Sequence, residues 1–394
     1  MGKRRTAGIG ACVALLMLVT ACGSDDGSGS ASSAGAKSSG GCPSGVKEEL
    51  QTKLDKYRAV PAFEAPGPAF DASKAQGKKI FNIPLLSTDT FNQIVDKASE
   101  KAAKAAGLQF VQYNNEGDPS QWVAGMNQAI SQKADLIILE GGPDPGALKP
   151  QIAAAKKAGI PVISTHRFDH DAVDQMLSEF DLDAIVPANH YLGSGELTAD
   201  YAMVNSDCNV NALILEAADV QPTSAGITSR FQDELKKYCP DSCKATAVNM
   251  PFSDWAQKAA GEMQSKLNQD PKINFIAPNF DQGAIYARKA ILSAGANDRV
   301  KIVAYNGSAP VMQMLADEQS VISEVGEPLE WLGWQNIDQA LRILSGVPPT
   351  TAGTPIRLFD KSNIAETGDP VVQTQGYGEA SAYENGFKQL WGLG

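Results

Sequence analysis

The sequence predicts an α/β protein with two doubly wound parallel-sheet lobes. The 394 residues are enough for two or three domains at about 150 residues each. From Gln76 onward, short apolar segments alternate with helical segments, which is the pattern of parallel βαβ units. The short segments are almost continuously apolar, as expected of strands that are buried on both faces.

An N-terminal helix and a connector precede these units. Residues 45–58 carry apolar side chains at three- and four-residue spacing, which predicts an amphipathic helix. Pro61, Pro66 and Pro68 then indicate an extended connector. Residues 45–75 are therefore expected to form a separate segment in front of the first lobe.

Ten strands are expected in the remaining chain. A single open sheet of ten strands would be near the practical limit, so two sheets of about five strands each are favoured. The intervening segments are amphipathic, as in residues 91–106, where the apolar side chains share one helix face. The expected strands are 80–86, 108–114, 135–140, 161–166, 184–189, 211–217, 245–250, 274–279, 301–306 and 321–326.

The composition argues against two classes of protein. Acidic residues outnumber basic ones by 45 to 34, and the formal net charge is −11. No nucleic-acid partner is expected, because such a protein needs Lys and Arg to neutralise phosphate. No apolar run approaches the roughly 20 residues that span a bilayer, which argues against an integral membrane channel.

The N-terminus has the features of an exported lipoprotein. Basic residues 3–5 and the short apolar stretch 11–20 predict a signal peptide over residues 1–21. The motif Val19-Thr20-Ala21-Cys22 resembles a bacterial lipobox, which predicts a diacylglyceryl group on Cys22. Ordinary cleavage before a Cys that later forms a disulfide is the alternative.

A flexible tether is expected after Cys22. Residues 23–41 contain only Gly, Ser, Ala, Asp and Lys, which cannot bury enough surface to fold. Residues 22–44 are therefore expected to be a linker from a lipid anchor to the globular body. This layout predicts a location at the extracytoplasmic face of the cell membrane.

The cysteines favour disulfide bonds over metal or redox chemistry. The chain contains six Cys and no Cys-x-x-Cys spacing. Export to an oxidising compartment instead favours disulfides. The six are Cys12, Cys22, Cys42, Cys208, Cys239 and Cys243.

Polar and aromatic side chains follow most of the predicted strands. In open α/β sheets, ligands bind beyond the carboxyl ends of the strands. Carboxylates, amides and a guanidinium can hold hydroxyl groups, and aromatic faces can cover the C–H face of a sugar ring. Each residue taken alone has the simpler explanation that loops are polar. The candidate ligand-binding residues are Asp89, Phe91, His166, Arg167, Asn189, Trp255, Asn279, Asp281, Asn306 and Glu327.

These residues lie within a family resemblance that covers roughly residues 76–365. Residues 158–167, Ala-Gly-Ile-Pro-Val-Ile-Ser-Thr-His-Arg, resemble a family motif A-x-I-P-V-I-x-x-D-R. Residues 83–91, 278–284 and 303–307, together with Asp254-Trp255, resemble further family segments. The chain thus resembles the type I solute-binding proteins of bacterial ABC importers, close to the ribose-binding group.

The resemblance implies a fold and a function. The fold would be the type I periplasmic binding protein, with a three-strand hinge near residues 189, 327 and 352. One lobe would contain residues 76–189 and 327–352, and the other residues 190–326 and 353–394. The protein would be a monomer that captures a monosaccharide or related polyol and delivers it to ABC permease subunits. No cofactor and no metal are expected.

The resemblance also implies roles in the cleft. Phe91 and Trp255 would sandwich the sugar ring from opposite lobes. Arg167 would give paired hydrogen bonds to hydroxyl groups, with Asp89 or Glu327 as its counter-charge. From the second lobe, Asn279, Asp281 and Asn306 would contact hydroxyls, while Glu327 would lie at the hinge.

Departures from the family pattern leave the identity of the sugar open. His166 and Asn306 each stand where Asp is usual, and Phe280 separates the usual Asn–Asp pair. The helix start at residues 223–230 lacks an early Arg that many sugar binders use, although Arg230 matches a later one.

The resemblance also favours one disulfide pairing. Cys208 and Cys243 each precede a strand, and in the family's sheet order these two strands are neighbours. A Cys208–Cys243 disulfide is therefore expected, with Cys239–Cys243 as the close alternative.

Three other functions remain open. A sugar sensor that feeds a membrane receptor would use the same fold and site. A secreted hydrolase is disfavoured because the chain has no Gly-x-Ser-x-Gly nucleophile motif and only three His. A metal site at His166, His170 and His190 is disfavoured because His166 ends a strand, so it does not share a helix face with His170.

Overall fold

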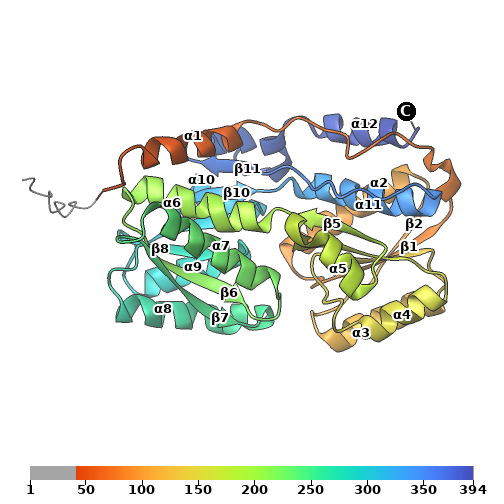
Figure 1. Cartoon of the computed structure of the whole chain (residues 1–394), viewed down its shortest axis with the longest axis horizontal. Coiled ribbons are helices and arrows are strands. Elements are labelled where there is room, and N and C mark those ends of the chain that lie inside the picture. Colours follow the sequence, from red (N-terminus) through yellow and green to blue (C-terminus); the bar gives the residue numbers. More distant parts are fainter. Residues whose placement is uncertain (1–40, 394) are drawn as a thin grey trace, which may run out of the picture. The chain divides into compact units, whose positions relative to one another are not determined.

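All ten predicted strands are present, and they form two sheets (Figure 1). The computed structural model describes residues 41–393. The predicted signal peptide 1–21, the predicted lipid site Cys22 and most of the linker 22–44 lie outside these residues. The two-lobed α/β fold predicted from the sequence is confirmed.

The first lobe is built on a parallel five-stranded sheet with the order β2-β1-β3-β4-β5. In β1, Ile80 is in register with Phe110 of β2 on one side and Leu136 of β3 on the other. The position of β1 between two neighbouring strands explains its nearly complete burial. The strands are β1 (Lys79–Pro84), β2 (Gln109–Gln112), β3 (Leu136–Glu140), β4 (Val162–Asp169) and β5 (Ala184–Ala188).

The second lobe contains a six-stranded sheet with the order β11-β10-β9-β8-β6-β7. Its edge strand β11 is antiparallel to β10 and was not predicted. The four residues of β11 are too few for a periodicity that distinguishes a strand from a loop. The strands are β6 (Asn211–Ala217), β7 (Lys244–Met250), β8 (Phe275–Pro278), β9 (Lys301–Asn306), β10 (Val321–Gly326) and β11 (Arg357–Asp360).

Helices cover both faces of the first sheet, because successive residues of β1 enter different cores. Ile80 packs with helices α2 and α11, whereas Phe81 packs with α3 and α4. The helices along the chain are α2 (Thr90–Ala105), α3 (Pro119–Ser131), α4 (Lys149–Lys157), α5 (Val173–Phe180), α6 (Thr198–Ser206), α7 (Thr223–Tyr238), α8 (Ala260–Gln269), α9 (Gln282–Ser293), α10 (Ala309–Ala316) and α11 (Leu329–Ser345). Short 3-10 or π-helical turns span Ala72–Ala75, His170–Ala172, Tyr191–Leu197, Phe252–Asp254, Trp255–Ala259, Ile364–Thr367 and Gln373–Tyr377.

Helix α11 follows the last parallel strand of the second lobe but packs on the first lobe. Its partner is α2, and Gly333 allows the two helices to approach closely. A Cβ atom at Gly333 would lie 2.6 Å from the Cβ of Ala98. The chain therefore returns to the first lobe directly after β10.

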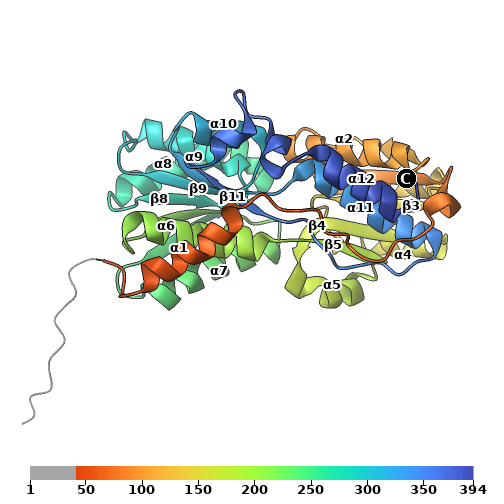
Figure 2. The same ribbon diagram turned by 90° about the horizontal axis from the view of Figure 1, so that it is seen from above.

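The C-terminal helix α12 (Ala380–Leu390) also packs on the first lobe (Figure 2). Trp391, just beyond it, stacks on Trp334 of α11 with 5.4 Å between the ring centroids. The Nε1 of Trp391 donates a hydrogen bond of 2.9 Å to Asp338. The predicted assignment of residues 353–394 to the second lobe is therefore wrong for α12, because these aromatic rings are buried in the core of the first lobe.

The N-terminal segment contacts both lobes. Leu50 and Leu54 of helix α1 (Val46–Arg58) are fully buried in the core of the second lobe. The chain then runs to the first lobe, where the ring of Phe63 lies 5.3 Å from that of Trp331. The backbone amide of Phe70 donates to the carbonyl of Leu390 at 2.8 Å. Residues 46–75 therefore form an arm, the N-terminal arm, that links the lobes outside the hinge (Figure 2).

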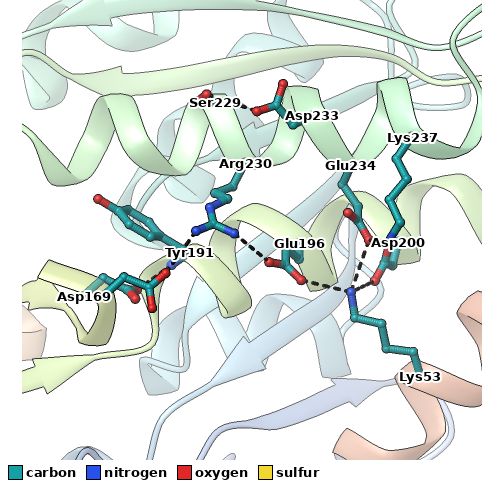
Figure 3. A network of polar contacts seen from close by, with 11 residues as sticks. Lys53, Asp169, Tyr191, Glu196, Asp200, Ser229, Arg230, Asp233, Glu234 and Lys237 are labelled. Carbon is teal, nitrogen blue, oxygen red and sulfur yellow. Dashed lines mark hydrogen bonds and ion pairs between the residues drawn. The ribbon is translucent and has the colours of Figure 1, made fainter. Parts of the chain in front are cut away.

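A partly buried ion cluster holds the arm on the second lobe (Figure 3). The ammonium of Lys53 lies 2.8 Å from Asp200, 3.1 Å from Glu196 and 3.2 Å from Glu234. Burial alone would lower the pKa of Lys53, but the surrounding carboxylates outweigh burial and raise it. Burial raises the pKa of Asp200 to about 7, and Lys53 is the charge that opposes this shift.

The disulfide bonds in the structure differ from the pairing that was favoured on the basis of the sequence. The structure contains Cys42–Cys208 and Cys239–Cys243, not Cys208–Cys243. Strands β6 and β7 are neighbours as expected, with Asn211 in register with Lys244. Cys208 nevertheless forms its disulfide with Cys42. Helix α1 packs on α6, and this packing brings Cys42, just before α1, close to Cys208, just after α6. Cys243 instead pairs with Cys239, which was the alternative.

Within residues 41–393, no helix is both long enough and apolar enough to cross a bilayer.

Substituting Lys53 should test the contribution of the ion cluster. Lys53→Met keeps the length of the side chain but leaves the buried carboxylate of Asp200 beside two others. We expect the free energy of unfolding to fall by about 2 kcal/mol at pH 7, measured by urea denaturation. Lys47→Met is the matched control on the same helix, because Lys47 pairs with Asp207 at 3.6 Å on the exposed surface. That variant should change stability by less than about 0.5 kcal/mol, and equal effects of the two substitutions would contradict the prediction.

Candidate functional site

A cavity of about 50 Å³ lies between the lobes, beyond the carboxyl ends of both sets of parallel strands. It is lined in the first lobe by β4 and by the segments that follow β1, β3 and β5, and in the second lobe by the end of β9 and by the segments that follow β6, β7 and β8. The position agrees with the rule that ligands bind beyond the carboxyl ends of parallel strands.

The first lobe provides an acidic, an aromatic and a basic side chain. Asp89 caps α2 by accepting a hydrogen bond of 3.2 Å from the backbone amide of Asn92. Phe91 lies in the first turn of the same helix, with its ring centroid 4.6 Å from that of His166. His166 and Arg167 come from β4, and all of these side chains line the cavity.

The second lobe provides two more aromatic rings, a carboxylate and an amide. Phe252 follows β7 and Phe280 follows β8, and both line the cavity. Asp281, next to Phe280, accepts a hydrogen bond of 2.7 Å from the amide of Ser308. Asn306 ends β9 and completes this wall of the cavity.

Arg167 connects the lobes through backbone carbonyl groups. Its guanidinium donates to the carbonyl of Gly142 in the first lobe, and to that of Gln221 in the second lobe at 2.9 Å. Burial lowers the pKa of Arg167, while the charges of Asp144 and Asp219 act in the opposite direction. Neither predicted counter-charge, Asp89 nor Glu327, contacts the guanidinium, and Asp144 lies 3.4 Å from it.

His166 and Glu327 form a buried contact between the lobes. The Nε2 of His166 contacts a carboxylate oxygen of Glu327, and both side chains are nearly inaccessible. Burial alone would raise the pKa of Glu327, but the charge and hydrogen bond of His166 outweigh burial and lower it. His166 has φ of 56°, which costs a residue other than Gly roughly 1–3 kcal/mol. The surrounding contacts must hold this backbone conformation.

His190 supports this contact from the hinge. Its Nε2 lies 3.1 Å from the carbonyl oxygen of His166, and its ring is 4.7 Å from that of His166. Burial, with the nearby charge of His166, lowers the pKa of His190 to about 3. His190 is therefore neutral at physiological pH.

The two cavity carboxylates have raised pKa values. Burial raises the pKa of Asp89, although hydrogen bonds from backbone amides oppose the shift. Burial raises the pKa of Asp281 to about 7, and the charge of Asp89 adds to this effect. The two side chains come from opposite lobes and are 8% and 4% exposed.

Trp255 does not line the cavity, contrary to the prediction. Its side chain is fully buried in the hydrophobic core of the second lobe, beneath Phe252 and Phe280. Trp255 begins a π-helical turn and faces the sheet, and a Cβ atom at Gly283 would lie 3.1 Å from its ring. The cavity aromatics of the second lobe are therefore Phe252 and Phe280.

Three other predicted ligand residues are also absent from the cavity wall. The amide of Asn279 donates to the carbonyl and hydroxyl of Ser224, at 2.8 Å each. Asn189 donates to the carbonyl of Thr354 at 2.7 Å and so ties two hinge segments together. Glu327 is used in the contact with His166. Each of the three side chains has a partner inside the protein, and none of them lines the cavity.

Six of the predicted residues do meet at the cavity, and several lining residues were missed. Phe252, Phe280 and His190 were the main omissions. The signal was available for both Phe residues, because each directly follows a predicted strand. No signal in the sequence distinguished the partly buried ring of Phe252, which lines the cavity, from the fully buried ring of Trp255 three residues later. The six that meet are Asp89, Phe91, His166, Arg167, Asp281 and Asn306.

Glu327→Gln should test the contact between the lobes. At pH 7 we expect the free energy of unfolding to fall by about 1–3 kcal/mol, because the buried Nε2 of His166 loses its carboxylate partner. The folded-state pKa of Glu327 lies below its ordinary value of 4.5, so this stabilisation is present above about pH 4.5 and is lost as the pH falls through the folded-state pKa. The difference in the free energy of unfolding between parent and variant, measured by urea unfolding across pH 3–8, should therefore become smaller in acid.

The control for this series is Glu100→Gln, on the exposed surface of α2. Its effect should stay within about 0.5 kcal/mol at every pH. A Glu327→Gln deficit that does not depend on pH would contradict the electrostatic explanation.

Comparison with known proteins shows the family to which the chain belongs. A model of the family described as "Periplasmic binding protein domain" matches residues 80–347. The ribose import binding protein RbsB of Escherichia coli K12 is 21% identical over 265 residues, which is 67% of this chain and 83% of that protein. The D-ribose/D-allose-binding protein of Pseudomonas aeruginosa is 23% identical over 255 residues, covering 64% of this chain and 74% of that protein.

Solved structures have the same fold. A solute-binding protein from Bacillus halodurans with bound myo-inositol superposes with a TM-score of 0.64 at 19% identity, over 75% of this chain and 99% of that one. The 5-methylthioribose transporter solute-binding protein of Thermotoga lettingae has a TM-score of 0.65 at 18% identity, over 80% and 98%. The family match extends from β1 through α11 and thus includes strands of both sheets, so the chain belongs to the periplasmic binding protein domain family.

Proposed function

We propose that the protein is an extracytoplasmic substrate-binding protein of an ABC transporter. It captures a monosaccharide or related polyol between its lobes and delivers it to a membrane permease, without catalysing a reaction on it. One observation carries this proposal. The cavity between the lobes combines three phenylalanine rings with carboxylate and amide groups, and the two lobes contribute from opposite sides.

The chemistry of the cavity suits a polyhydroxylated ring. Phe91, Phe252 and Phe280 offer flat apolar faces for C–H groups, and Asp89 and Asp281 can accept hydrogen bonds from hydroxyls. The relatives support this class of ligand, since the matched proteins are described as binding ribose, allose or fructose. Structural neighbours include complexes with myo-inositol, allitol and D-allose.

Ligand entry requires that the lobes separate by a hinge motion. Among residues 41–393, the polar contacts that oppose this motion include the buried pair of His166 and Glu327. Thr223 of the second lobe donates to the carbonyl of Arg167 at 2.6 Å, and the Arg167 guanidinium reaches Gln221. At the edge of the lobes, Arg230 of the second lobe pairs with Asp171 of the first at 3.0 Å. Within the second lobe, Arg230 also lies 3.5 Å from Glu196 (Figure 3). Arg230 and Asp171 are both well exposed, so this pair adds little to closure.

A binding screen should identify the class of ligand. We expect the melting temperature of the full chain to rise with at least one pentose, hexose or polyol, and not with amino acids. A ligand at a thousand times its Kd stabilises the folded state by about 4 kcal/mol. Phe280→Ala should then weaken that ligand about 10- to 100-fold in calorimetry, because a ring face is lost.

Trp255→Phe is the contrasting variant in the same screen. It should lower stability, since Trp255 is a core residue, but leave affinity within about threefold. If Trp255→Phe lost affinity and Phe280→Ala did not, the assignment of Phe280 rather than Trp255 to the cavity wall would be contradicted.

The lipid anchor is a second part of the proposal. The motif Val19-Thr20-Ala21-Cys22 and the Gly/Ser-rich tether support attachment at the outer face of the membrane. Mass spectrometry of the mature N-terminus should find a diacylglyceryl-modified Cys22, and Cys22→Ala should release the protein from the membrane fraction. An unmodified Cys22 in the membrane-bound protein would contradict the proposal.

A further inference from the structure

His190 is a buried cavity residue with an unused ring nitrogen. It comes just after β5, at the hinge, and its side chain lines the cavity while only 2% exposed. Among residues 41–393, no atom is the hydrogen-bond partner of its Nδ1. A buried polar atom without a partner is costly, because it has lost its bonds to water. A group that enters the cavity can supply the missing bond.

The other ring nitrogen decides what the Nδ1 of His190 can do. The Nε2 lies 3.1 Å from the carbonyl oxygen of His166. A carbonyl oxygen only accepts hydrogen bonds, so Nε2 carries the ring hydrogen, and in a neutral imidazole the second nitrogen is then an acceptor. Burial keeps the ring neutral, since it lowers the pKa of His190 to about 3. Nδ1 therefore has a lone pair and no hydrogen.

Rings from both lobes hold His190 in place. Its ring centroid lies 4.7 Å from that of His166 in the first lobe, and 5.6 Å from those of Phe280 and Tyr305 in the second. All three contacts are edge-to-face. An imidazole packed in this way cannot turn freely toward another partner. The position of its Nδ1 is therefore fixed before a ligand binds.

A buried donor in the same cavity complements this acceptor. The Nε of Arg167 also has no hydrogen-bond partner among residues 41–393, whereas both terminal nitrogens donate to carbonyl groups. A guanidinium nitrogen can only donate. A ligand that satisfies both atoms has to offer a donor and an acceptor. Hydroxyl groups do both, which agrees with a sugar or polyol.

We propose that a hydroxyl group of the ligand donates its hydrogen to the Nδ1 of His190, and that this bond makes His190 a specificity-determining residue. The inference rests on the proposed function and adds to it a contact at the hinge. The contact selects by direction, because this nitrogen only accepts. A ligand with a hydrogen, a fluorine or an ether oxygen at that position leaves Nδ1 without a partner.

The first experiment is calorimetry on the full chain with matched ligands. The probes are D-ribose, D-allose, D-fructose and myo-inositol, which represent the ligands named for relatives and structural neighbours. The tightest of the four is then measured beside analogues in which each hydroxyl in turn is replaced by hydrogen or by fluorine. At the position that bonds to His190, hydrogen should weaken binding about 10- to 100-fold. Fluorine should weaken it as much, because it cannot donate.

His190→Gln identifies which position bonds to His190. Gln places an N–H group near the position of Nε2, so the bond to the carbonyl of His166 is kept, but no acceptor stands at the position of Nδ1. The variant should bind the unmodified sugar about 10- to 100-fold more weakly than the parent protein does. The analogue that lacks the bonding hydroxyl should differ by no more than about threefold between the two proteins, since its bond is already absent.

His190→Asn tests the same contact by rescue. Asn places an amide oxygen near the position of Nδ1, but it has no donor that reaches the carbonyl of His166. It should bind the sugar within about fivefold of the parent protein, while its melting temperature falls below that of His190→Gln. A purely structural role predicts the opposite order of affinities, because affinity would then follow stability.

His170→Gln is the matched control, since His170 is exposed and does not line the cavity. It should bind the sugar as the parent protein does. Melting curves check that each variant is folded.

Nitrogen-15 NMR of the parent protein, labelled at its three histidines, gives a readout that needs no variant. The Nδ1 resonance of His190 should move upfield when the sugar is added, as an imidazole nitrogen does when it accepts a hydrogen bond. The resonances of His170 should stay in place. An unchanged Nδ1 resonance of His190 in the saturated complex would overturn the inference.

The outcomes separate this inference from the proposed function. A hydroxyl whose loss matters in the parent protein but not in His190→Gln supports it. Tight binding of every fluorine analogue, or no position that depends on His190, would overturn it and leave a sugar-binding role intact. Binding of none of the four probes would overturn the inference together with the proposed class of ligand.

Discussion

The carboxyl ends of the parallel strands in both lobes meet at one cleft, and the rest of the site depends on this arrangement. Each parallel strand ends in a loop whose backbone is no longer paired, so that loop can present side chains to a ligand. Asp89, Arg167, Phe280 and Asn306 are far apart in the chain but lie at or just beyond the carboxyl ends of strands that end at the same place. The hinge keeps these ends opposed because three chain segments cross it.

Several polar side chains near the hinge are bonded to other parts of the protein and do not face the cavity. Glu327 contacts His166, Asn189 is bonded to Thr354, and Asn279 is bonded to Ser224. A buried polar group that lacked a partner would cost about 1–3 kcal/mol, so these contacts are needed for stability. The side chains left for a ligand are those at the ends of strands and starts of helices, and their charges decide which ligand the cavity can hold.

The N-terminal arm adds a link between the lobes that the hinge does not include. A disulfide and an ion cluster hold its helix on the second lobe, and Phe63 and Phe70 hold its end on the first. Helix α12 makes a comparable return from the second lobe to the first. Both segments lie outside residues 80–347, the part of the chain that the family model matches.

The sequence by itself determined how many parallel strands there are and where they lie along the chain, because continuous apolar runs separated by amphipathic segments allow few other assignments. It also determined which loops reach the cleft, since loop position follows from strand direction. Only the tertiary structure decided which side chain of each loop faces the cavity. Phe252 and Trp255 are three residues apart, and the packing of a π-helical turn sends Trp255 into the core. Long-range packing likewise decided which cysteine pairs with Cys208 and on which lobe α12 packs. The local periodicity of the sequence contains no information about such packing.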